Sequence, residues 1–185
     1  EKLKSEKSAL MQQLLTGKTR LPGFEDEWKD VALSNIFERI TKTAGADTPR
    51  VLSITAGTGF VDQREKFSRV IAGKNIAKYI QLKRGDFSYN KGNSKRYPMG
   101  CVYQLHEYDD GVVPNVFYSF RSKGEVNTSY YKFLFKSGYL NHQLSRCINS
   151  GVRNDGLLNL NARDFFKSIV PHPPIPEQQA ISTTL

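Results

Sequence analysis

The stretch from Gly85 to Gly100 contains residue types that suit the binding of a polyanion. From the end of the strand-like Phe87–Asn90 segment onward, its charged and polar side chains are Asn90, Lys91, Asn93, Ser94, Lys95, Arg96 and Tyr97. Cationic side chains neutralise phosphates, asparagine amides form paired hydrogen bonds with base edges, and glycines let a backbone approach closely. The same residue types are typical of any solvated loop. Nucleic-acid contact and a plain surface loop are both open interpretations of this stretch.

A second loop with similar chemistry runs from Asn149 to Asp155. It follows a predicted helix end and places Arg153 beside Asn154, and these two residue types read guanine and adenine edges. The alternative is a helix-capping turn in which Arg153 pairs with Asp155. The residues do not decide between the two.

Patterns typical of catalysis are incomplete. Glu27–Lys29 has the Glu-x-Lys spacing of a nuclease motif but no acid at a suitable distance before it. Pro173–Pro174 follows His172 and precedes Ile175, so the amide and the aromatic ring of an amino-methyltransferase motif are both missing. Gly57–Gly59 lacks the remainder of a phosphate-binding loop. None of these three catalytic or phosphate-binding motifs is therefore complete in the sequence.

Metal ligation is also disfavoured by the spacing of the candidate ligands. Cys101 and Cys147 are far apart and form no CxxC pair, and the three histidines are scattered. We expect small buried thiols and no metal or cofactor on this chain.

The charge balance favours an acidic partner. Twenty-seven Lys and Arg against eighteen Asp and Glu give a net charge of +9, which suits nucleic acid or an anionic membrane surface. No apolar run approaches the length of a membrane span, and the first residues lack the apolar core of a signal peptide. These features predict a soluble, cytoplasmic protein with no membrane partner.

Helical segments are expected at both ends of the chain. Residues 1–16 carry an apolar stripe of Leu3, Leu10, Met11 and Leu14, and Gly17 stands where a C-terminal cap belongs. So short a helix needs a partner helix, and a second helix begins near Pro176. The two ends resemble pieces of longer helices cut at both boundaries, which indicates a fragment or a truncated variant.

Between the ends, the pattern predicts an α+β fold with a twisted, largely antiparallel or mixed sheet and packed helices. A short helix is expected within 28–39. An Asp109–Gly111 turn is predicted. Asn127 or Thr128 should cap a helix whose face includes Tyr131, Leu134 and Phe135, and the helical spacing that continues after Gly138 indicates either a second helix or a kinked continuation. The predicted strands are Val51–Thr55, Tyr79–Leu82, Phe87–Asn90, Cys101–Leu105 and Val116–Arg121.

Four stretches in order carry a resemblance to a known family: Leu10–Phe24, Gly85–Lys91, Asp110–Phe117 and Ile169–Ile181, the last with a Pro-Pro-x-Pro-Glu-Gln run. The chain resembles the specificity subunit of type I restriction-modification systems, over its C-terminal target-recognition domain and parts of the flanking conserved helices. The resemblance divides the chain into the end of a spacer helix (1–20), a DNA target-recognition domain (21–175) and the start of a distal conserved helix (176–185).

The resemblance implies a non-catalytic subunit that binds double-stranded DNA and reads one half of a bipartite site. It also implies docking to a methyltransferase subunit, which carries S-adenosylmethionine, and to restriction subunits that use ATP with Mg²⁺. Because one recognition domain is present, self-association through the helices is a further expectation. The alternative is a protein-interaction module whose DNA binding is incidental and non-specific.

Within that family role, two sets of side chains are predicted to contact DNA. The expected phosphate contacts are Lys91, Lys95, Arg96 and Lys123, with some of Arg64, Lys66 and Arg69. The expected base-edge contacts are Asn90, Asn93, Tyr97, Arg153 and Asn154.

Overall fold

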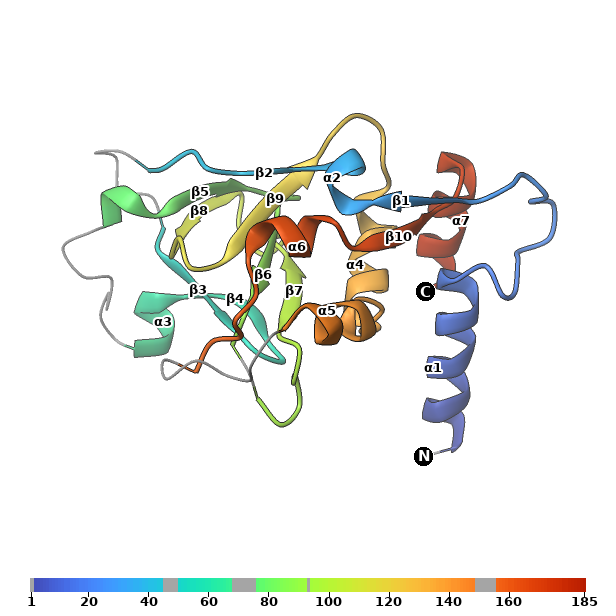
Figure 1. Ribbon diagram of the computed structural model, residues 1–185, viewed down its shortest axis with the longest axis horizontal. Coiled ribbons are helices and arrows are strands. Elements are labelled where there is room, and N and C mark those ends of the chain that lie inside the picture. The colour runs from blue at the N-terminus through green and yellow to red at the C-terminus, as the bar shows by residue number, and fades with distance from the viewer. Residues whose placement is uncertain (1, 45–49, 68–75, 93, 149–155) are drawn as a thin grey trace.

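The computed structural model describes residues 2–44, 50–67, 76–92, 94–148 and 156–185, without the side chains of residues 2–4, 66 and 67. Seven α-helices, one 3₁₀ turn and ten short strands alternate irregularly in this part of the chain (Figure 1). The helices are α1 (Lys2–Leu15), α2 (Leu33–Ile36), α3 (Gln63–Phe67), α4 (Thr128–Lys136), α5 (Asn141–Cys147), α6 (Ala162–Phe166) and α7 (Ile175–Thr184), and the 3₁₀ turn is η1 (Ile76–Lys78). The predicted α+β class is confirmed.

The strands form several small antiparallel sheets. A four-stranded sheet has the order β2 (Phe37–Arg39), β9 (Tyr118–Ser122), β6 (Phe87–Asn90) and β7 (Cys101–Gln104). Three two-stranded sheets pair β1 (Lys29–Ala32) with β10 (Ile169–His172), β3 (Leu52–Thr55) with β4 (Gly59–Asp62), and β5 (Ile80–Lys83) with β8 (Asp110–Val113).

The Asp109–Gly111 segment differs from its predicted turn. Asp110 and Gly111 begin β8 and pair with Lys83 and Leu82. A Cβ atom at Gly111 would lie 2.5 Å from Cδ1 of Leu52, so this glycine permits close packing of β8 against β3. The sequence predicted that Gly111 belongs to a turn, whereas in the structure it permits close packing of two strands.

The short helix predicted within 28–39, with Ser34 near its start, is confirmed as α2. Only the single turn α2 is helical, and the strands β1 and β2 flank it. Val31 pairs with Val170 near the other end of the chain, and Phe37 pairs with Ser122. These long-range pairings limit the helix to a single turn.

The helix cap at Asn127 is confirmed, because its side chain accepts a hydrogen bond from the Tyr130 amide. Tyr131, Leu134 and Phe135 on α4 are buried as predicted. They face an aromatic core in which Phe87 stacks on Phe120 with centroids 5.4 Å apart. The aromatic side chains therefore build the core and form no exposed stacking platform there.

A second core cluster lies between β3, β5 and β8 and includes Leu52, Leu82, Leu105 and Val113.

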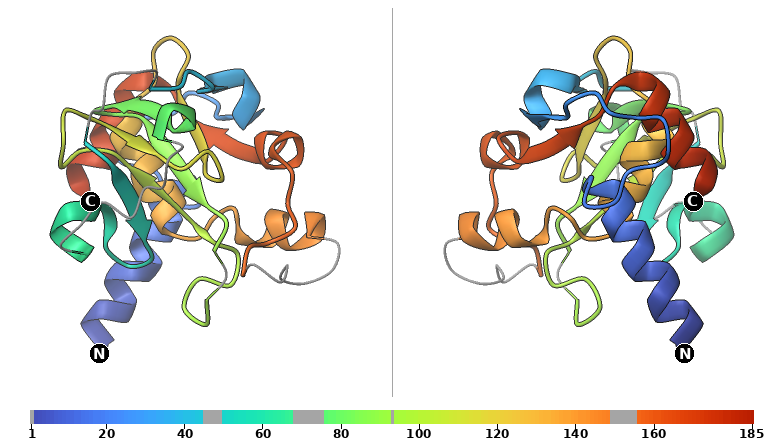
Figure 2. Two further views of the ribbon diagram at one scale, coloured as in Figure 1. Left: turned by 90° about the vertical axis from the view of Figure 1, so that its left-hand side faces the viewer. Right: turned by 90° about the vertical axis from the view of Figure 1, so that its right-hand side faces the viewer.

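The first helix, α1, projects from the body of the molecule (Figures 1 and 2). Its C-terminal end is anchored, because Leu14 and Leu15 are buried and the Tyr130 hydroxyl of α4 donates to the Leu15 carbonyl at 2.9 Å. Met11 is partly buried against the same core, whereas Leu10 is 51% exposed. The predicted apolar stripe is thus divided between an internal partner, α4, and solvent; the side chain of Leu3 lies outside the described part.

The start of α7 is tied to the segment after α1. Glu177 is fully buried and accepts hydrogen bonds from Arg20 (2.5 and 2.7 Å) and from the Trp28 indole (2.7 Å). The hydrogen bond and charge of Glu177 raise the pKa of the Arg20 guanidinium. The Glu-Gln pair that was noted only as a sequence motif is therefore a buried junction between the two chain ends.

None of the helices described is both long and apolar enough to cross a membrane.

Candidate nucleic-acid interface

The loop between β6 and β7, residues 91–100, extends beyond the four-stranded sheet (Figures 1 and 2). Ser94 and Tyr97 close it, since the Tyr97 amide donates to the Ser94 hydroxyl at 3.1 Å and the two backbones also bond each other. Lys95 and Arg96 lie at the exposed tip of this turn. The Arg96 guanidinium lies 5.5 Å from the centroid of the Tyr97 ring, which is cation–π range. The loop therefore presents two adjacent cations on a hydrogen-bonded frame.

Asn90, at the base of this loop, uses its amide within the protein. Its Nδ2 donates to the Ile54 carbonyl at 3.2 Å, and its Oδ1 accepts from the Gly92 amide at 2.8 Å. An amide engaged at both ends would have to exchange these bonds before it could read a base. In this conformation Asn90 organises the loop.

The sequence predicted Lys91 on the surface of the loop, but the structure buries its side chain. Its side chain is 8% exposed, and its ammonium lies 3.2 Å from the Tyr118 hydroxyl and 4.6 Å from the Tyr118 ring centroid. Lys91 follows directly on β6, and Tyr118 is the first residue of the neighbouring strand β9. This placement argues against the predicted phosphate contact, because the charge points into the molecule.

The tip of the β3–β4 hairpin, residues 56–58, lies beside the 91–100 loop. The Gly57 amide donates to the Tyr103 hydroxyl at 2.6 Å. A Cβ atom at Gly57 would lie 3.6 Å from the Tyr97 hydroxyl and 3.7 Å from the Arg96 guanidinium. All three tip residues are exposed. The Gly57–Gly59 sequence indicated only an incomplete phosphate-binding loop, and no local signal indicated its proximity to Arg96.

The second candidate loop is represented only by the residues that follow it. Gly92 forms a β-bridge with Leu157, and the Leu158 amide donates to the Lys91 carbonyl at 2.9 Å. The segment 156–160 therefore lies against the base of the 91–100 loop. Arg153 and Asn154, like Asn93, lie outside the described residues.

The remaining predicted phosphate contacts lie elsewhere. Lys123 follows β9 at the end opposite to Tyr118, and its ammonium donates to the Ser34 carbonyl at 2.6 Å. Arg64 lies in α3, at the end of β4 away from the hairpin tip (Figure 1). Lys66 is in the same helix with its side chain outside the described part, and Arg69 lies outside it entirely. The structure thus separates Lys123 and Arg64 from Lys95 and Arg96.

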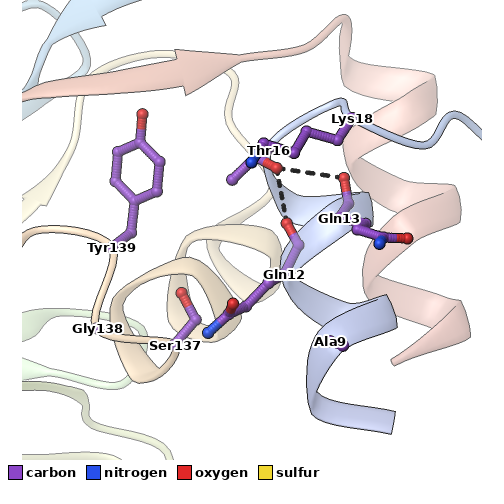
Figure 3. Close-up of a pocket in the computed structure, with 8 residues that line it drawn as sticks. All are labelled: Ala9, Gln12, Gln13, Thr16, Lys18, Ser137, Gly138 and Tyr139. Carbon is purple, nitrogen blue, oxygen red and sulfur yellow. Dashed lines mark hydrogen bonds between the residues drawn. The ribbon is translucent and has the colours of Figure 1, made fainter. Parts of the chain in front are cut away.

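A pocket of about 380 Å³ lies on the helical side of the molecule, between α1 and the end of α4 (Figure 3). It is lined by Ala9, Gln12, Gln13, Thr16, Lys18, Ser137, Gly138 and Tyr139. Thr16 caps the helix end by donating to the Gln12 carbonyl at 2.8 Å. The lining contains hydroxyls and one lysine but no carboxylate, histidine or thiol beside them that could act as the activating base.

Burial shifts the pKa of two groups that could act in catalysis, His172 and Cys101. His172 Nδ1 lies 2.7 Å from the Tyr131 hydroxyl, and burial, with a smaller effect of Lys29, lowers the pKa of this imidazole. Burial raises the pKa of the Cys101 thiol to about 11, which disfavours the nucleophilic thiolate. Within the described ranges, no group of three or more His, Cys, Asp or Glu side chains could hold a metal ion.

Comparison with known proteins yields structural neighbours only. No family model and no curated protein matches the sequence. An HsdS subunit from Thermoanaerobacter tengcongensis superposes with a TM-score of 0.55 and 16% identity, over 99% of this chain and 44% of that one. A chain from a study of complex assembly and conformational transition of the type I R-M system gives 0.57 and 15%, over 99% and 45%. The S subunit of a type I restriction-modification system from M. genitalium gives 0.53 and 14%, over 94% and 43%.

These likenesses span nearly all of this chain and less than half of the length of each solved neighbour. They include the projecting helix α1, the sheets and the start of α7, since almost no residue is left out of the two broader superpositions. The chain therefore has the α+β fold of one part of the type I restriction-modification S subunits.

Proposed function

We propose that the chain is a DNA target-recognition module of a type I restriction-modification specificity subunit, which reads one half of a bipartite site. One observation carries the proposal. On a fold shared with S subunits, the exposed Lys95–Arg96 turn and the exposed β3–β4 tip lie side by side at one end of the molecule. Cations beside a glycine-containing turn are the features expected at a DNA backbone.

The shape of this end suits a DNA groove. The B-DNA major groove is about 12 Å wide and admits a two-stranded β-ribbon. The β6–β7 loop and the β3–β4 tip are both ends of such ribbons. In our proposal Lys95 and Arg96 contact phosphates, while Tyr97 and the exposed Thr58 approach base edges. Arg153, Asn154 and Asn93 keep the base-contact role proposed from their residue types.

The proposed module contributes binding and no catalysis. Methyltransferase and restriction subunits would dock on the helical side and supply S-adenosylmethionine, ATP and Mg²⁺ themselves. Self-association through the helices, which would place two modules on a two-fold axis, belongs to the same proposal. The complex would act on DNA in the cytoplasm.

The experiment that tests the proposal is selection of bound duplexes from a randomised library at near-physiological salt. The chain is used together with a methyltransferase subunit, and a Lys95→Ala, Arg96→Ala double variant serves as the matched control. We expect enrichment of a half-site of about three to five base pairs, the footprint of a single reading element. A folded, partnered chain that enriches no sequence would contradict the proposal.

A second candidate function, a protein-interaction module, is favoured by the pocket beside α1 and by the exposed Leu10. The two functions differ in their salt dependence. Contact with about five phosphates gives a log-log slope of affinity against salt near −4 to −5. A slope near zero on DNA, combined with tight binding of a protein partner, would favour the interaction module.

A further inference from the structure

Lys91 is unusual because it is a buried charge whose described partner is uncharged. Lysine is rarely buried unless it is paired with an acid, since removing its charge from water is costly. The ammonium of Lys91 contacts the hydroxyl and ring of Tyr118, and among the described residues it forms no ion pair. The interactions described for the Lys91 ammonium are therefore a hydrogen bond and a cation–π contact, both with Tyr118.

The contacts of Lys91 continue into a second segment. Its ammonium donates to the Tyr118 hydroxyl at 3.2 Å, and that hydroxyl donates to the Leu160 carbonyl at 2.5 Å. The backbone of the same residue also holds this segment, because the Lys91 carbonyl accepts from the Leu158 amide at 2.9 Å. Lys91 is thus connected to the 156–160 segment in two ways. Its main chain bonds Leu158 directly, and its side chain bonds Tyr118, which in turn bonds Leu160.

The residue before Lys91 ties a third segment to the same point. The amide of Asn90 bonds the Ile54 carbonyl, which precedes the β3–β4 tip, and the Gly92 amide within the loop. The end of β6 therefore joins the hairpin tip, the 91–100 loop and the 156–160 segment. These segments are far apart in the sequence.

We infer that Lys91 and Tyr118 are positioning residues that set the placement of the 91–100 loop relative to the 156–160 segment, and through it the sequence preference of the module. The inference rests on the proposed function. Reading a base edge requires groups held to within about 0.5 Å. Weakening the hydrogen bonds that connect the 91–100 loop to the 156–160 segment should therefore lower the preference for the specific DNA sequence. Phosphate contacts tolerate such shifts better, because charge attraction has little directional demand.

The test uses two variants that keep side-chain volume, Lys91→Met and Tyr118→Phe, with Lys83→Met as the matched control. Lys83 ends β5 and is exposed, so its variant removes the same charge without touching the hydrogen bonds of Lys91 and Tyr118. Amide hydrogen exchange is measured first, on the chain without DNA. We expect exchange of the loop and of residues 156–160 to become about ten-fold faster in both variants and to stay unchanged in the control.

Binding is then measured on the selected half-site and on random duplexes over a range of salt. We expect the ratio of the two affinities to fall about ten-fold in both variants, with affinity for random DNA and the salt slope preserved. A variant Lys91→Met that weakens all duplexes alike and lowers the slope by about one would reveal a direct phosphate contact and overturn the inference.

Other outcomes separate this inference from the proposed function. Unchanged exchange and unchanged preference would overturn it, and so would loss of the folded state in both variants, which indicates a purely structural role. If the parent chain shows no sequence preference, the proposed function fails, whereas the exchange data still decide whether Lys91 and Tyr118 hold the two segments together.

Discussion

At the residue scale, the chemistry of a side chain proved less informative than its direction. Lys91, Lys95 and Arg96 are equivalent as cations in the sequence, yet one is buried on Tyr118 and two are exposed. Asn90 has the amide of a base reader and uses it to hold Ile54 and Gly92. Each difference follows from where the residue stands relative to the end of β6.

His172 carries a prediction at the same scale. Burial lowers the pKa of its imidazole from the usual 6.5, and the neutral ring can accept the Tyr131 hydroxyl at Nδ1. The unfolded state therefore binds a proton more readily, and the contribution of His172 to stability is present above pH 6.5 and is lost as pH falls through its lower folded pKa. We expect His172→Asn, which keeps an acceptor near the Nδ1 position, to flatten the loss of stability below that pH.

Urea unfolding at a series of pH values measures this effect, with His142→Asn as the control because His142 is exposed on α5. A slope of unfolding free energy against pH that is the same in His172→Asn and in the parent chain would contradict the prediction.

At the element scale, the structure shows how the helical ends attach to the body. The C-terminal end of α1 rests on α4 through Tyr130 and Leu15, and the start of α7 holds Arg20 and Trp28 through Glu177. Trp28 also meets Tyr130 edge to face, with centroids 6.4 Å apart. The two ends and α4 therefore form one connected junction.

Glu177→Gln tests the contribution of this junction. The variant keeps the shape of the side chain but removes the charge that Arg20 pairs with, and an amide NH₂ would face the guanidinium. We expect a loss of about 2 kcal/mol of unfolding free energy, below the cost usual for a broken, fully buried pair because Arg20 is partly exposed. Chemical denaturation measures it. The exposed Glu38→Gln on β2 should stay within about 0.5 kcal/mol, and an equal effect in both variants would refute the role of the junction.

At the scale of the whole molecule, the positive charge is spread over more than one face. Lys95 and Arg96 lie on the β6–β7 loop, whereas Lys123 lies at the opposite end of the central sheet and bonds Ser34. A net charge of +9 therefore describes the whole surface and does not identify the binding end.

The salt dependence of DNA affinity shows whether binding depends on the cations of the 91–100 loop or on the net charge of the whole protein. Each phosphate contact contributes about 0.9 to the log-log slope, so the double variant Lys95→Ala, Arg96→Ala should reduce the slope by about 2. Lys123→Ala removes a charge far from the loop and should leave the slope unchanged. Filter-binding or anisotropy titrations between low and near-physiological salt measure both. Equal reductions per charge at the two sites would indicate that DNA contacts are not confined to the proposed interface.

The sequence by itself determined much of the local structure. The strand at Phe87–Asn90, the Asn127 cap, the buried face of α4 and the α+β class all follow from short-range patterns, and the structure confirms them. Periodicity and capping depend on neighbours within a few residues, so they are readable without a fold. The polyanion chemistry of the 91–100 loop was readable in the same way and stays a prediction.

Only the tertiary structure decided which segments meet. It set strands with distant partners on both sides of the short helix α2, made Gly111 a packing contact, and turned Lys91 inward. It also brought the β3–β4 tip to Arg96 and moved Lys123 to the far end of the sheet. These outcomes depend on contacts between residues that are remote in the chain, and the free energy of such contacts exceeds the local preferences that a sequence pattern reports.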